Sequence, residues 1–565
     1  MTVYHYGLNA DPHELWYTML HSTRTHIGVD TETHSVADIT MLGLGISDDP
    51  DDAFYITTDD EDFPAVVEML QNPVVHKIYH NAPFDLRVLR QYNVDIDNVD
   101  DTALMARLYP EPSAVLEDVS FWVNRQTQSM KHVFEAQGVT RVTDLPQAVL
   151  AEKCCKDSMA TRALYDYYAG LIDMDYYEWI RPMYGILTRI SRQGILLDQD
   201  RLNELNVHYG AIITRLRQEC TDLGFSVSSP AQVGDFLARR GNWLPVAPAG
   251  KQLVSDDEHL AKMDDPVAKK VLEFRHASKM ESTYIRPFLG RPRAYTTLRM
   301  EAGTGRVNST NAGKNQPDRN LQNIPKQAEV KSEAESVRGA FIPDSGTFTK
   351  LDQSQGELRI TADLSQDKNM IDIFARDEDM HQWVVNETGL SRTQAKNLSY
   401  GIGYGGDDET IANFLHMSDL AQVRYFKEAY RNMFPQAWDW YAEQEERGMR
   451  DGIVYTKKGR PLLLPAIGGE KHLRNCARNY SVQGTAFEAM TDVMLDPAIL
   501  KYLDITRLQV HDELIFDGDI EIEGMVYNEA KTAKEGHPTW DIRGRLAWLS
   551  GFYAPLEVQK VTRWG

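Results

Sequence analysis

The chain has 565 residues, and its 83 Asp and Glu against 60 Lys and Arg give a formal charge of −23. This length fits about three or four domains of ~150 residues, and the acidic balance alone argues against nucleic-acid binding. The four cysteines show neither metal-ligand spacing nor a disulfide framework, which excludes a small disulfide-stapled secreted domain. We see no signal peptide and no run of about 20 apolar residues, so we expect a soluble protein of a reducing compartment.

An acid pair follows the first strand that the pattern predicts. In "HIGVDTETHS", residues 26–29 read as a strand, and Asp30 and Glu32 come directly after it. Alternate residues of an extended chain share a face, so both carboxylates point the same way. Two such carboxylates repel each other unless a cation lies between them. The pair therefore indicates a divalent metal, although two exposed acids at a strand end, the commoner case, show the same pattern.

Two later segments supply the further acids that such a metal site needs. "IYHNAPFDLRVLRQY" places Asn81 and Asp85 at a strand-to-helix junction, and "CCKDSMATRALYDYY" places Asp157 at the start of an amphipathic helix. Together with the acid pair, these residues predict a two-metal site, in which one cation activates water and the other steadies the leaving oxygen.

In order and local context, four acids resemble the metal ligands of the DEDD exonucleases, such as the proofreading domains of DNA polymerases: Asp30, Glu32, Asp85 and Asp157. The segment over residues 100–120 also resembles the one that these domains carry between their second and third motifs. The resemblance implies a 3′→5′ exonuclease that binds two Mg²⁺ ions, with Mn²⁺ as a substitute.

One position departs from that family. A Tyr four residues before the last aspartate, or a His five residues before it, usually orients the attacking water, and this chain has Lys153 and Glu152 at those places. We therefore expect a complete metal site with an altered water-positioning group. A polymerase whose exonuclease is weak or inactive remains an alternative.

A single acid marks the next predicted strand. "FTKLDQSQGELRITADLSQD" predicts a strand over 348–351 that leads into a helix starting near Ser354, with Asp352 at the strand end. Taken alone, this residue is an acid near a helix N-terminus, which is a favourable place for one.

A helix predicted from about Ser391 carries cations and aromatic residues in "SRTQAKNLSYGIGYGG". They recur every four residues, at Arg392, Lys396, Tyr400 and Tyr404. At ~100° per residue all four lie on one broad face. That face suits a triphosphate held by the two cations, with Tyr400 against a base or sugar. A solvated basic face with snorkelling side chains is the competing interpretation.

A tight hairpin is predicted in "LQVHDELIFDGD". Its apolar stretches, 508–510 and 514–516, are hinged on His511, Asp512 and Glu513, with adjacent acids in place of the usual Asn-Gly or Asp-Gly. A rigid turn positions a carboxylate well. If the fold brings Asp512 beside Asp352, the two form a second two-metal site, which activates a hydroxyl and neutralises a pyrophosphate.

These three segments resemble motifs A, B and C of the family A DNA polymerases, which include bacterial DNA polymerase I and replicative enzymes of some bacteriophages. Further likenesses occur in family order, in "GRVNST", "NLQNIP", "VRGAFIP", "DMHQWV", "NYSVQGTAFEAM" and "SKMESTYIRP". The likeness covers nearly the whole chain. It implies an α/β multidomain protein, with a ribonuclease H-like exonuclease domain followed by a right-hand polymerase domain of palm, fingers and thumb.

The resemblance also implies residue roles. The catalytic set is Asp352 and Asp512 as metal ligands, with Arg392 and Lys396 as the triphosphate clamp. The nucleotide site adds Tyr400, His381, Gln355 and Glu357, the last as the steric gate against a 2′-hydroxyl. Contacts with primer–template DNA are implied for Lys279, Arg306, Gln322, Asn323, Tyr404, Asn479, Gln483 and His511.

Two departures in the polymerase motifs carry predictions. Tyr400 stands where many relatives have Phe, which in this family implies weak discrimination against dideoxynucleotides. Gly356 stands where an Ile is usual, which predicts looser checking of the sugar or base pair beside the gate. Only ten residues separate His381 from Arg392, so we expect compact fingers.

We expect an exonuclease domain over 1–182 and a polymerase domain over 183–565. The latter divides into a thumb near 200–295, a palm near 296–369 and 476–565, and fingers near 370–475. No 5′-nuclease domain and no processivity-factor insertion are expected. The expected ligands are primer–template DNA, dNTPs and Mg²⁺, and the expected enzyme is a monomer of the cytoplasm, in the host cell if phage-encoded, with other replication proteins as partners.

Local basic clusters explain how a −23 chain would hold DNA. They are Lys314, Arg319, Lys326 and Lys331 around "NLQNIP", and Lys457, Lys458 and Arg460 in "KKGRP". Two further alternatives stay open. One is a DEDD exonuclease with a non-catalytic nucleic-acid-binding C-terminal region, and the other is a non-enzymatic replication scaffold.

Overall fold

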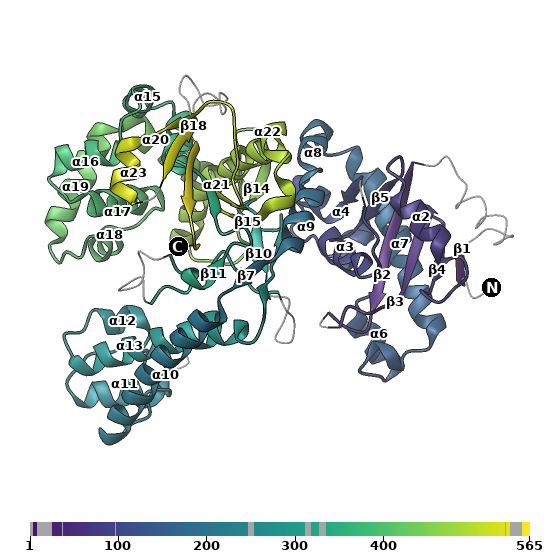
Figure 1. Ribbon diagram of the computed structural model, residues 1–565, viewed down its shortest axis with the longest axis horizontal. Coiled ribbons are helices and arrows are strands. Elements are labelled where there is room, and N and C mark those ends of the chain that lie inside the picture. The colour runs from purple at the N-terminus through teal and green to yellow at the C-terminus, as the bar shows by residue number, and fades with distance from the viewer. Residues whose placement is uncertain are drawn as a thin grey trace.

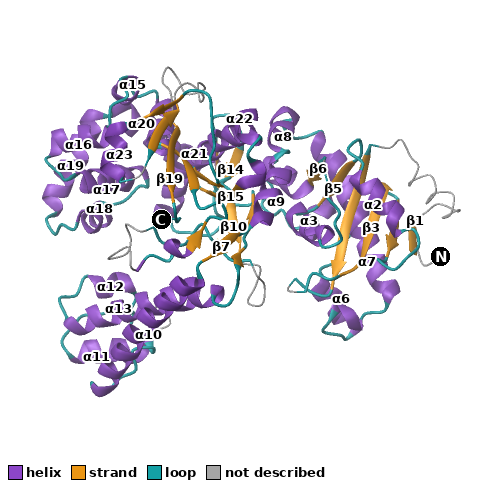
Figure 2. Ribbon diagram, viewed as in Figure 1, coloured by secondary structure: helices purple, strands orange, loops and turns teal. Residues whose placement is uncertain are grey.

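The computed structural model describes residues 4–7, 25–36, 38–96, 98–246, 253–310, 318–326, 335–536, 538–542 and 556–564. Figure 1 shows an N-terminal lobe in purple, a helical arm in blue to teal, and a larger lobe in green to yellow. Both lobes contain a sheet with helices packed around it (Figure 2), which confirms the predicted mixed α/β class. None of the helices described is long and apolar enough to span a membrane.

The N-terminal lobe is built on a six-stranded mixed sheet of order β1-β4-β3-β2-β5-β6, in which β2, β5 and β6 run parallel. The strands are β1 (Tyr4–Gly7), β2 (His26–Thr33), β3 (Met41–Asp49), β4 (Asp52–Ile56), β5 (His76–Tyr79) and β6 (Val99–Asp101). The helices and 3₁₀ turns are α2 (Phe63–Gln71), α3 (Ala82–Arg90), α4 (Thr102–Leu108), α5 (Leu116–Val119), η1 (Ser120–Val123), α6 (Met130–Gln137), η2 (Val142–Asp144) and α7 (Gln147–Ala169).

Helix α7 lies unusually close to the sheet because two glycines face it. A Cβ at Gly28 of β2 would clash with the Ser158 carbonyl oxygen, and one at Gly45 of β3 would lie 2.7 Å from the Cys154 carbonyl oxygen. Only glycine permits this approach of two backbones. The middle of α7 is thereby pressed against the strand that carries the first acid pair.

A helical arm follows the first lobe. Its elements are α8 (Met174–Ile180), α9 (Met183–Gln193), β7 (Ile195–Leu197), α10 (Gln199–Asp222), α11 (Pro230–Arg239), α12 (Asp257–Ala261), α13 (Pro266–Lys279), a π-helical turn η3 (Met280–Ile285) and η4 (Arg286–Phe288). Helices α10, α11 and α13 enclose a small apolar core of their own, around Leu216, Val233 and Val271. The outer part of the arm therefore has a core of its own, whereas α8, α9 and the inner ends of α10 and α13 pack into the main core.

The larger lobe contains a second six-stranded sheet, antiparallel throughout, of order β15-β16-β12-β19-β18-β17. Its strands are β12 (Phe348–Gln353), β15 (Thr506–Val510), β16 (Glu513–Asp517), β17 (Met525–Tyr527), β18 (Thr539–Ile542) and β19 (Leu556–Val561). Strand β12 lies between two strands from the last tenth of the chain. Short strands precede it, at β8 (Arg293–Ala294), β9 (Thr297–Arg299), β10 (Asn308–Thr310) and β11 (Phe341–Ile342), with a turn η7 (Arg338–Ala340).

Helices cover this sheet and form a mainly helical subregion beside it (Figure 1). They are α14 (Gly356–Ser365), α15 (Lys368–Ala375), α16 (Met380–Thr388), α17 (Arg392–Gly403), α18 (Asp408–Leu415), α19 (Leu420–Met433), α20 (Pro435–Asp451), α21 (Glu470–Leu495), α22 (Pro497–Leu500) and α23 (Glu529–Glu535). A hairpin of β13 (Ile453–Tyr455) and β14 (Pro461–Leu463) and a turn η8 (Leu503–Ile505) complete the lobe.

Local predictions from the sequence agree with these elements at most positions. The predicted hairpin is β15 and β16, and the helix predicted from about Ser391 is α17, whose Ser391 and Gln394 form a reciprocal N-terminal cap. One local prediction is wrong. Asp157 lies in the middle of α7, not at the start of a helix, because α7 begins ten residues earlier, at Gln147. Its buried residues lie around much of its circumference, so amphipathic patterning could not mark its beginning.

Candidate active sites

The second sheet brings Asp352 beside the hairpin acids. In the register of β12 and β16, Asp352 lies opposite Glu513, and the Gln353 backbone N–H donates to the Asp512 carbonyl oxygen at 3.1 Å. These residues are about 160 positions apart in the sequence, and backbone pairing alone places them together. The predicted juxtaposition of Asp352 and Asp512 is thus built into the sheet.

The turn that carries Asp512 is held by a chain of side-chain amides. His511 adopts a left-handed conformation (φ 57°), which non-glycine residues seldom occupy. Its carbonyl oxygen accepts a hydrogen bond from Gln509 Nε2 at 2.6 Å, and the Gln509 carbonyl accepts one from Gln322 Nε2 at 3.0 Å. Gln322 is buried and supports the hairpin through this hydrogen bond. Its contact with DNA stays a prediction.

Among the described residues, Glu513 forms an ion pair with Lys350, while Asp352 and Asp512 form none. Burial, and after it the neighbouring Asp512 and Glu513, raise the pKa of Asp352 well above its usual range. Burial also raises the pKa of Asp512, against the opposing effect of Lys326. A divalent cation fits this donor set, because it would remove the repulsion and hold both groups ionised.

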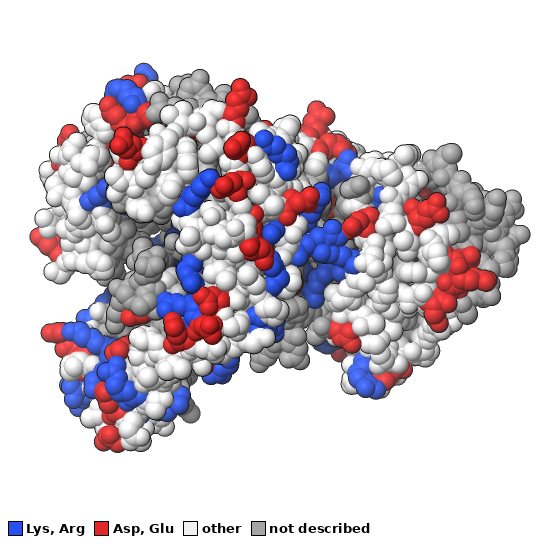
Figure 3. Space-filling view, viewed as in Figure 1, with Lys and Arg blue, Asp and Glu red and all other residues white. Residues whose placement is uncertain are grey.

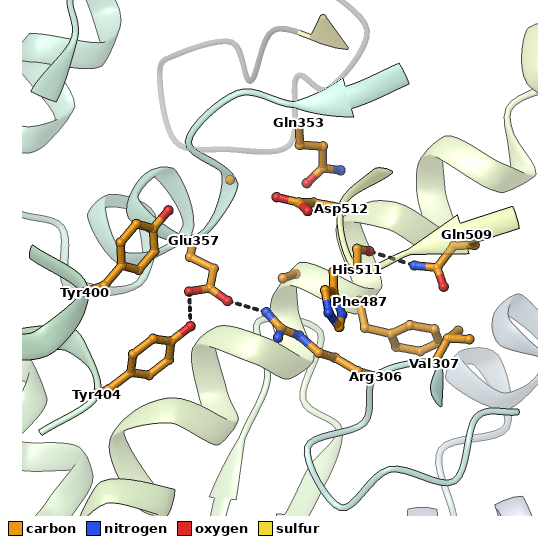
Figure 4. A pocket seen from close by; sticks show the side chains of 12 residues that line it. Arg306, Val307, Gln353, Glu357, Tyr400, Tyr404, Phe487, Gln509, His511 and Asp512 are labelled. Carbon is orange, nitrogen blue, oxygen red and sulfur yellow. Dashed lines mark hydrogen bonds and ion pairs between the residues drawn. The ribbon is translucent and has the colours of Figure 1, made fainter. Parts of the chain in front are cut away.

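A cavity of about 240 Å³ opens beside these acids (Figure 4). Glu357, at the first turn of α14, accepts a hydrogen bond from the Tyr404 hydroxyl at 2.8 Å and forms an ion pair with Arg306. Tyr400 and Asp512 also line the cavity. The predicted gate residue is therefore fixed from two sides at the wall of a pocket, which also contains His511, Gln353 and Gly356.

Of the four residues on the basic face of α17, Tyr400 and Tyr404 line the cavity, whereas Arg392 and Lys396 do not. Arg392 Nη2 lies 2.8 Å from Asp379 Oδ2, while Lys396 is exposed, with Nζ 5.9 Å from the Tyr400 ring centre. His381 is buried with its ring centre 6.1 Å from that of Tyr400, and burial lowers its pKa to about 4. His381 is therefore a neutral imidazole at pH 7. Gln355, whose Oε1 has no partner among the described residues, has a left-handed backbone at the N-cap of α14.

The residues predicted to contact DNA are dispersed. Arg306, Tyr404 and His511 line the cavity, Asn479 and Gln483 lie one turn apart on α21, Asn323 is exposed, and Lys279 ends α13. Of the basic clusters, Lys314 and Lys331 lie outside the described residues. The "KKGRP" cluster is not a free cationic surface: Lys457 and Lys458 pair with Asp363 and Asp492, and Arg460 is buried.

The first lobe assembles the other four acids. Ligand atoms of Asp30, Glu32 and the Cys154 thiol lie within 4.8 Å of one another. Asp85 is positioned by Thr31, whose backbone N–H and hydroxyl donate to its Oδ1 at 3.0 and 2.7 Å. Burial raises the pKa of Asp85 to about 7, and the Thr31 hydrogen bonds oppose this effect. Asp157 joins the group from α7, and its Oδ1 is buried without a partner among the described residues.

Lys153 reaches into this acid cluster. Its ammonium donates to Glu32 Oε1 and to Asp157 Oδ2, each at 2.7 Å. Although burial alone would lower the pKa of Lys153, the carboxylates of Glu32, Asp157 and Asp30 raise it well above its usual range. A cation fits among these carboxylates, since Asp30 and the free Asp157 oxygen have no ion-pair partner in the described part of the chain.

A cluster of arginines that sequence reasoning missed lies between the lobes. Arg87 and Arg90 of α3 and Arg192 of α9 line a cavity of about 470 Å³. Figure 3 shows Lys and Arg side chains gathered in the hollow between the lobes. The spacing of Arg87 and Arg90, three residues apart on a helix, indicates a shared face. Their proximity to Arg192 depends on the packing of α3 against α9, which no local pattern reports.

Comparison with known families decides the relationship. The model of DNA polymerase family A matches residues 199–535, which is more than half of the chain. The chain belongs to DNA polymerase family A. A 3′-5′ exonuclease model matches residues 9–152, so this family A chain combines the two domains in the predicted order. The exonuclease match ends one residue before Lys153.

The curated relatives of this family A chain are bacterial DNA polymerases I. The enzyme of Chloroflexus aurantiacus is 28% identical over 552 residues, 86% of this chain and 56% of the relative. The thermostable enzyme of Thermus aquaticus is 30% identical, and the match covers 64% of this chain and 46% of the relative. The enzyme of Bacillus subtilis is 26% identical, and the match covers 80% of this chain and 55% of the relative. The chain thus spans about half the length of the curated relatives it matches. Whether it comes from a bacteriophage stays a prediction.

A solved structure shares the fold. The polymerase domain of Pol1 from M. smegmatis, in complex with DNA primer-template and dNTP, matches with a TM-score of 0.74 at 24% identity. The match covers 98% of this chain and 99% of that domain, so both lobes and the helical arm correspond.

Proposed function

We propose that the chain is a template-directed DNA polymerase that adds dNTPs to a primer 3′ end and removes mispaired ends with its 3′→5′ exonuclease. The observation that carries the proposal is the register of β12 and β16, which sets Asp352 beside the turn of Asp512. The two acids come from distant segments and have no structural need for each other, and Asp512 lines the pocket. Family membership and the fold shared with a DNA-bound polymerase domain support this assignment.

In the polymerase reaction, Asp352 and Asp512 would hold Mg²⁺, or Mn²⁺ in its place. Mg²⁺ bound there would acidify the primer 3′-hydroxyl and neutralise the departing pyrophosphate. Arg392 and Lys396 would bind the triphosphate once Arg392 exchanges Asp379 for phosphate oxygens, and neutral His381 would contribute one hydrogen bond. In the first lobe, Asp30, Glu32, Asp85 and Asp157 would be the corresponding cation ligands.

The side chains around the cavity would select the nucleotide. Glu357, fixed by Arg306 and Tyr404, occupies the place where a ribose 2′-hydroxyl would enter, so a ribonucleotide would meet a side chain that cannot move aside without breaking both contacts. Tyr400 would lie against the incoming base or sugar. The domain boundaries proposed from sequence, near 182 for the exonuclease and near 295, 369 and 475 for thumb, palm and fingers, remain part of this proposal.

One gel tests both activities. A 5′-labelled primer on a longer template is incubated with Mg²⁺, with and without the four dNTPs, and we expect extension with dNTPs and shortening without them. Asp512→Asn should reduce extension by about 10³-fold, since a lost metal ligand removes ~4 kcal/mol of transition-state stabilisation, and should leave shortening intact. Asp30→Ala should reduce shortening and leave extension intact.

Asp519→Asn is the matched control for the hairpin, because Asp519 lies just beyond β16, is mainly exposed and forms an ion pair with Lys560. It should extend like the unsubstituted protein. Extension by Asp512→Asn at an undiminished rate would contradict the assignment of the polymerase site. Shortening by Asp30→Ala would contradict that of the exonuclease.

A further inference from the structure

The exonuclease cluster contains a cation of its own. Lys153 Nζ lies 2.7 Å from Glu32 Oε1 and 2.7 Å from Asp157 Oδ2, and the side chains of all three residues are nearly buried. Among the residues that the structure describes, Lys153 is the only Lys or Arg that forms an ion pair with the four acids of the cluster. The ammonium thus bridges two acids that come from different elements, β2 and α7.

Helix α7 fixes the position of the Lys153 ammonium between Glu32 and Asp157. Lys153 and Asp157 are one turn apart on α7, so their side chains share a face. The glycines at positions 28 and 45 let the neighbouring face of α7, at Cys154 and Ser158, pack closely against β2 and β3. The Lys153 side chain is 14% exposed and contacts the carboxylates directly, and together with Asp157 it lines a cavity of about 260 Å³.

A divalent cation between the same two oxygens would have to displace the ammonium. Mg²⁺ binds carboxylate oxygens at about 2.0–2.1 Å, so an ion bridging Glu32 Oε1 and Asp157 Oδ2 would occupy the volume that Nζ fills. The other side of the cluster remains suitable for a cation. Asp30 has no ion-pair partner, Asp157 Oδ1 is buried without a partner among the described residues, and the Cys154 thiol lies 3.3 Å from Asp30 Oδ2.

We propose that the Lys153 ammonium takes the place of one of the two divalent cations, so that the exonuclease site binds a single metal ion. The inference rests on the proposed exonuclease function of this cluster. The residue that stands where relatives place a water-orienting side chain is then a built-in positive charge, and Lys153 is a positioning residue for Glu32 and Asp157.

Counting bound Mn²⁺ by electron paramagnetic resonance tests this without any nuclease assay. All proteins carry Asp352→Asn and Asp512→Asn, so that the polymerase site does not contribute ions. Asp30→Ala on this background gives the count that remains when the exonuclease site is lost. We expect the Lys153 protein to bind one ion more than that reference and Lys153→Met to bind two more, because Met fills a similar volume without charge.

Lys156→Met is the matched control. Lys156 lies on the same helix, one turn from Lys153, but is half-exposed and pairs with Glu152 outside the cluster. It should bind one ion more than the reference, and so should Lys153→Arg, which keeps a cation. The proposal would be overturned if the Lys153 protein bound two ions more than the reference, or no more than the reference. It would also be overturned if Lys153→Met bound no more ions than the Lys153 protein.

A second readout separates this proposal from the assignment of function. With the polymerase site restored, Lys153→Met should extend a primer as the unsubstituted protein does. At limiting Mn²⁺, its shortening rate should rise with the square of the Mn²⁺ concentration, whereas the shortening rate of the Lys153 protein should rise linearly. If no variant shortens DNA while the ion counts stand as expected, the exonuclease function fails and the metal inference holds. If shortening occurs and the counts are equal, only the inference fails.

Discussion

Tyr400 lines the cavity, between His381 and Tyr404. Its ring centre is 6.2 Å from that of Tyr404 and 6.1 Å from that of His381. In the proposed polymerase site, a phenol hydroxyl there would replace the hydrogen bond that a missing sugar 3′-hydroxyl would otherwise make. One such bond is worth ~1.5–3 kcal/mol, so Tyr400→Phe should raise discrimination against dideoxynucleotides about 10- to 100-fold.

Competition between dATP and ddATP at a single template position measures this discrimination. Tyr425→Phe is a suitable control, because Tyr425 is exposed on α19 and does not line the cavity. The unsubstituted protein should terminate readily. Strong rejection of ddATP before any substitution would show that Tyr400 does not play this role.

Gly356 lines the cavity next to Glu357, the proposed gate residue. A Cβ there would lie 3.2 Å from Gln353 Oε1 and 3.4 Å from Gln353 Cβ, so a larger side chain fits once that amide shifts slightly. Gly356→Ile adds apolar bulk next to Glu357 and should lower ribonucleotide use or misincorporation about tenfold, a change of the size that small groups produce in a tight pocket. Single-nucleotide insertion with rNTPs or mismatched dNTPs measures it, and unchanged ratios would refute the role of this position.

At the scale of elements, a buried carboxylate joins two helices of the region proposed as fingers. Asp367 is fully buried and accepts hydrogen bonds from Met370 N at 3.0 Å, at the start of α15, and from Gln436 N and Ala437 N at 3.0 and 3.1 Å, in α20. Asp419, which is exposed, caps only its own helix α19.

Substituting these two caps should have unequal effects. Asp367→Ala should destabilise the protein by ~3 kcal/mol, since it removes a cap and leaves buried N–H groups unpaired. Asp419→Ala should cost ~1 kcal/mol. Thermal melting of both variants measures the ratio. Equal shifts in the melting temperature would mean that Asp367 does not hold α15 to α20.

Some elements could be predicted from the sequence, and others could not. The hairpin of Asp512 and the start of α17 carry local signals, namely short apolar runs around polar turn residues and a capping Ser, and both were predicted correctly. Asp157 was misplaced because α7 is buried on several sides and its pattern does not mark its ends. The bracing of the hairpin by buried Gln322 and the position of Lys153 between two acids depend on long-range packing, which no local pattern encodes.

At the scale of the whole molecule, the charge is unevenly distributed. Acidic side chains lie on the outer surface of the N-terminal lobe and basic ones in the hollow between the lobes (Figure 3), while the chain as a whole carries a formal charge of −23. Counter-ion release from a few cationic contacts would then drive DNA binding, and the acidic exterior would oppose non-specific contacts.

Affinity for random duplex DNA should therefore fall about 10³-fold or more between about 50 and 200 mM salt. Lys326→Ala, which removes an exposed cation whose charge acts on Asp352 and Asp512, should reduce the magnitude of the log–log slope by about 1. Lys131→Ala, on exposed α6 of the first lobe, should leave the slope unchanged. Filter binding across a salt series gives both slopes, and tight binding at high salt would refute the electrostatic account.

The position of β12 between β16 and β19 also determines the order in which parts of the chain can fold during translation. The first lobe can fold from residues 4–169 as soon as they leave the exit tunnel. Strand β12 must wait until β16 and then β19, at Leu556–Val561, have been synthesised. For the time that translation of some 200 residues takes, the nascent chain contains the acid cluster of the first lobe, the proposed exonuclease site, and an unpaired strand with Asp352 at its end. A ribosome that stalls before Leu556 would hold a chain that degrades primers but lacks the completed sheet with which to extend them.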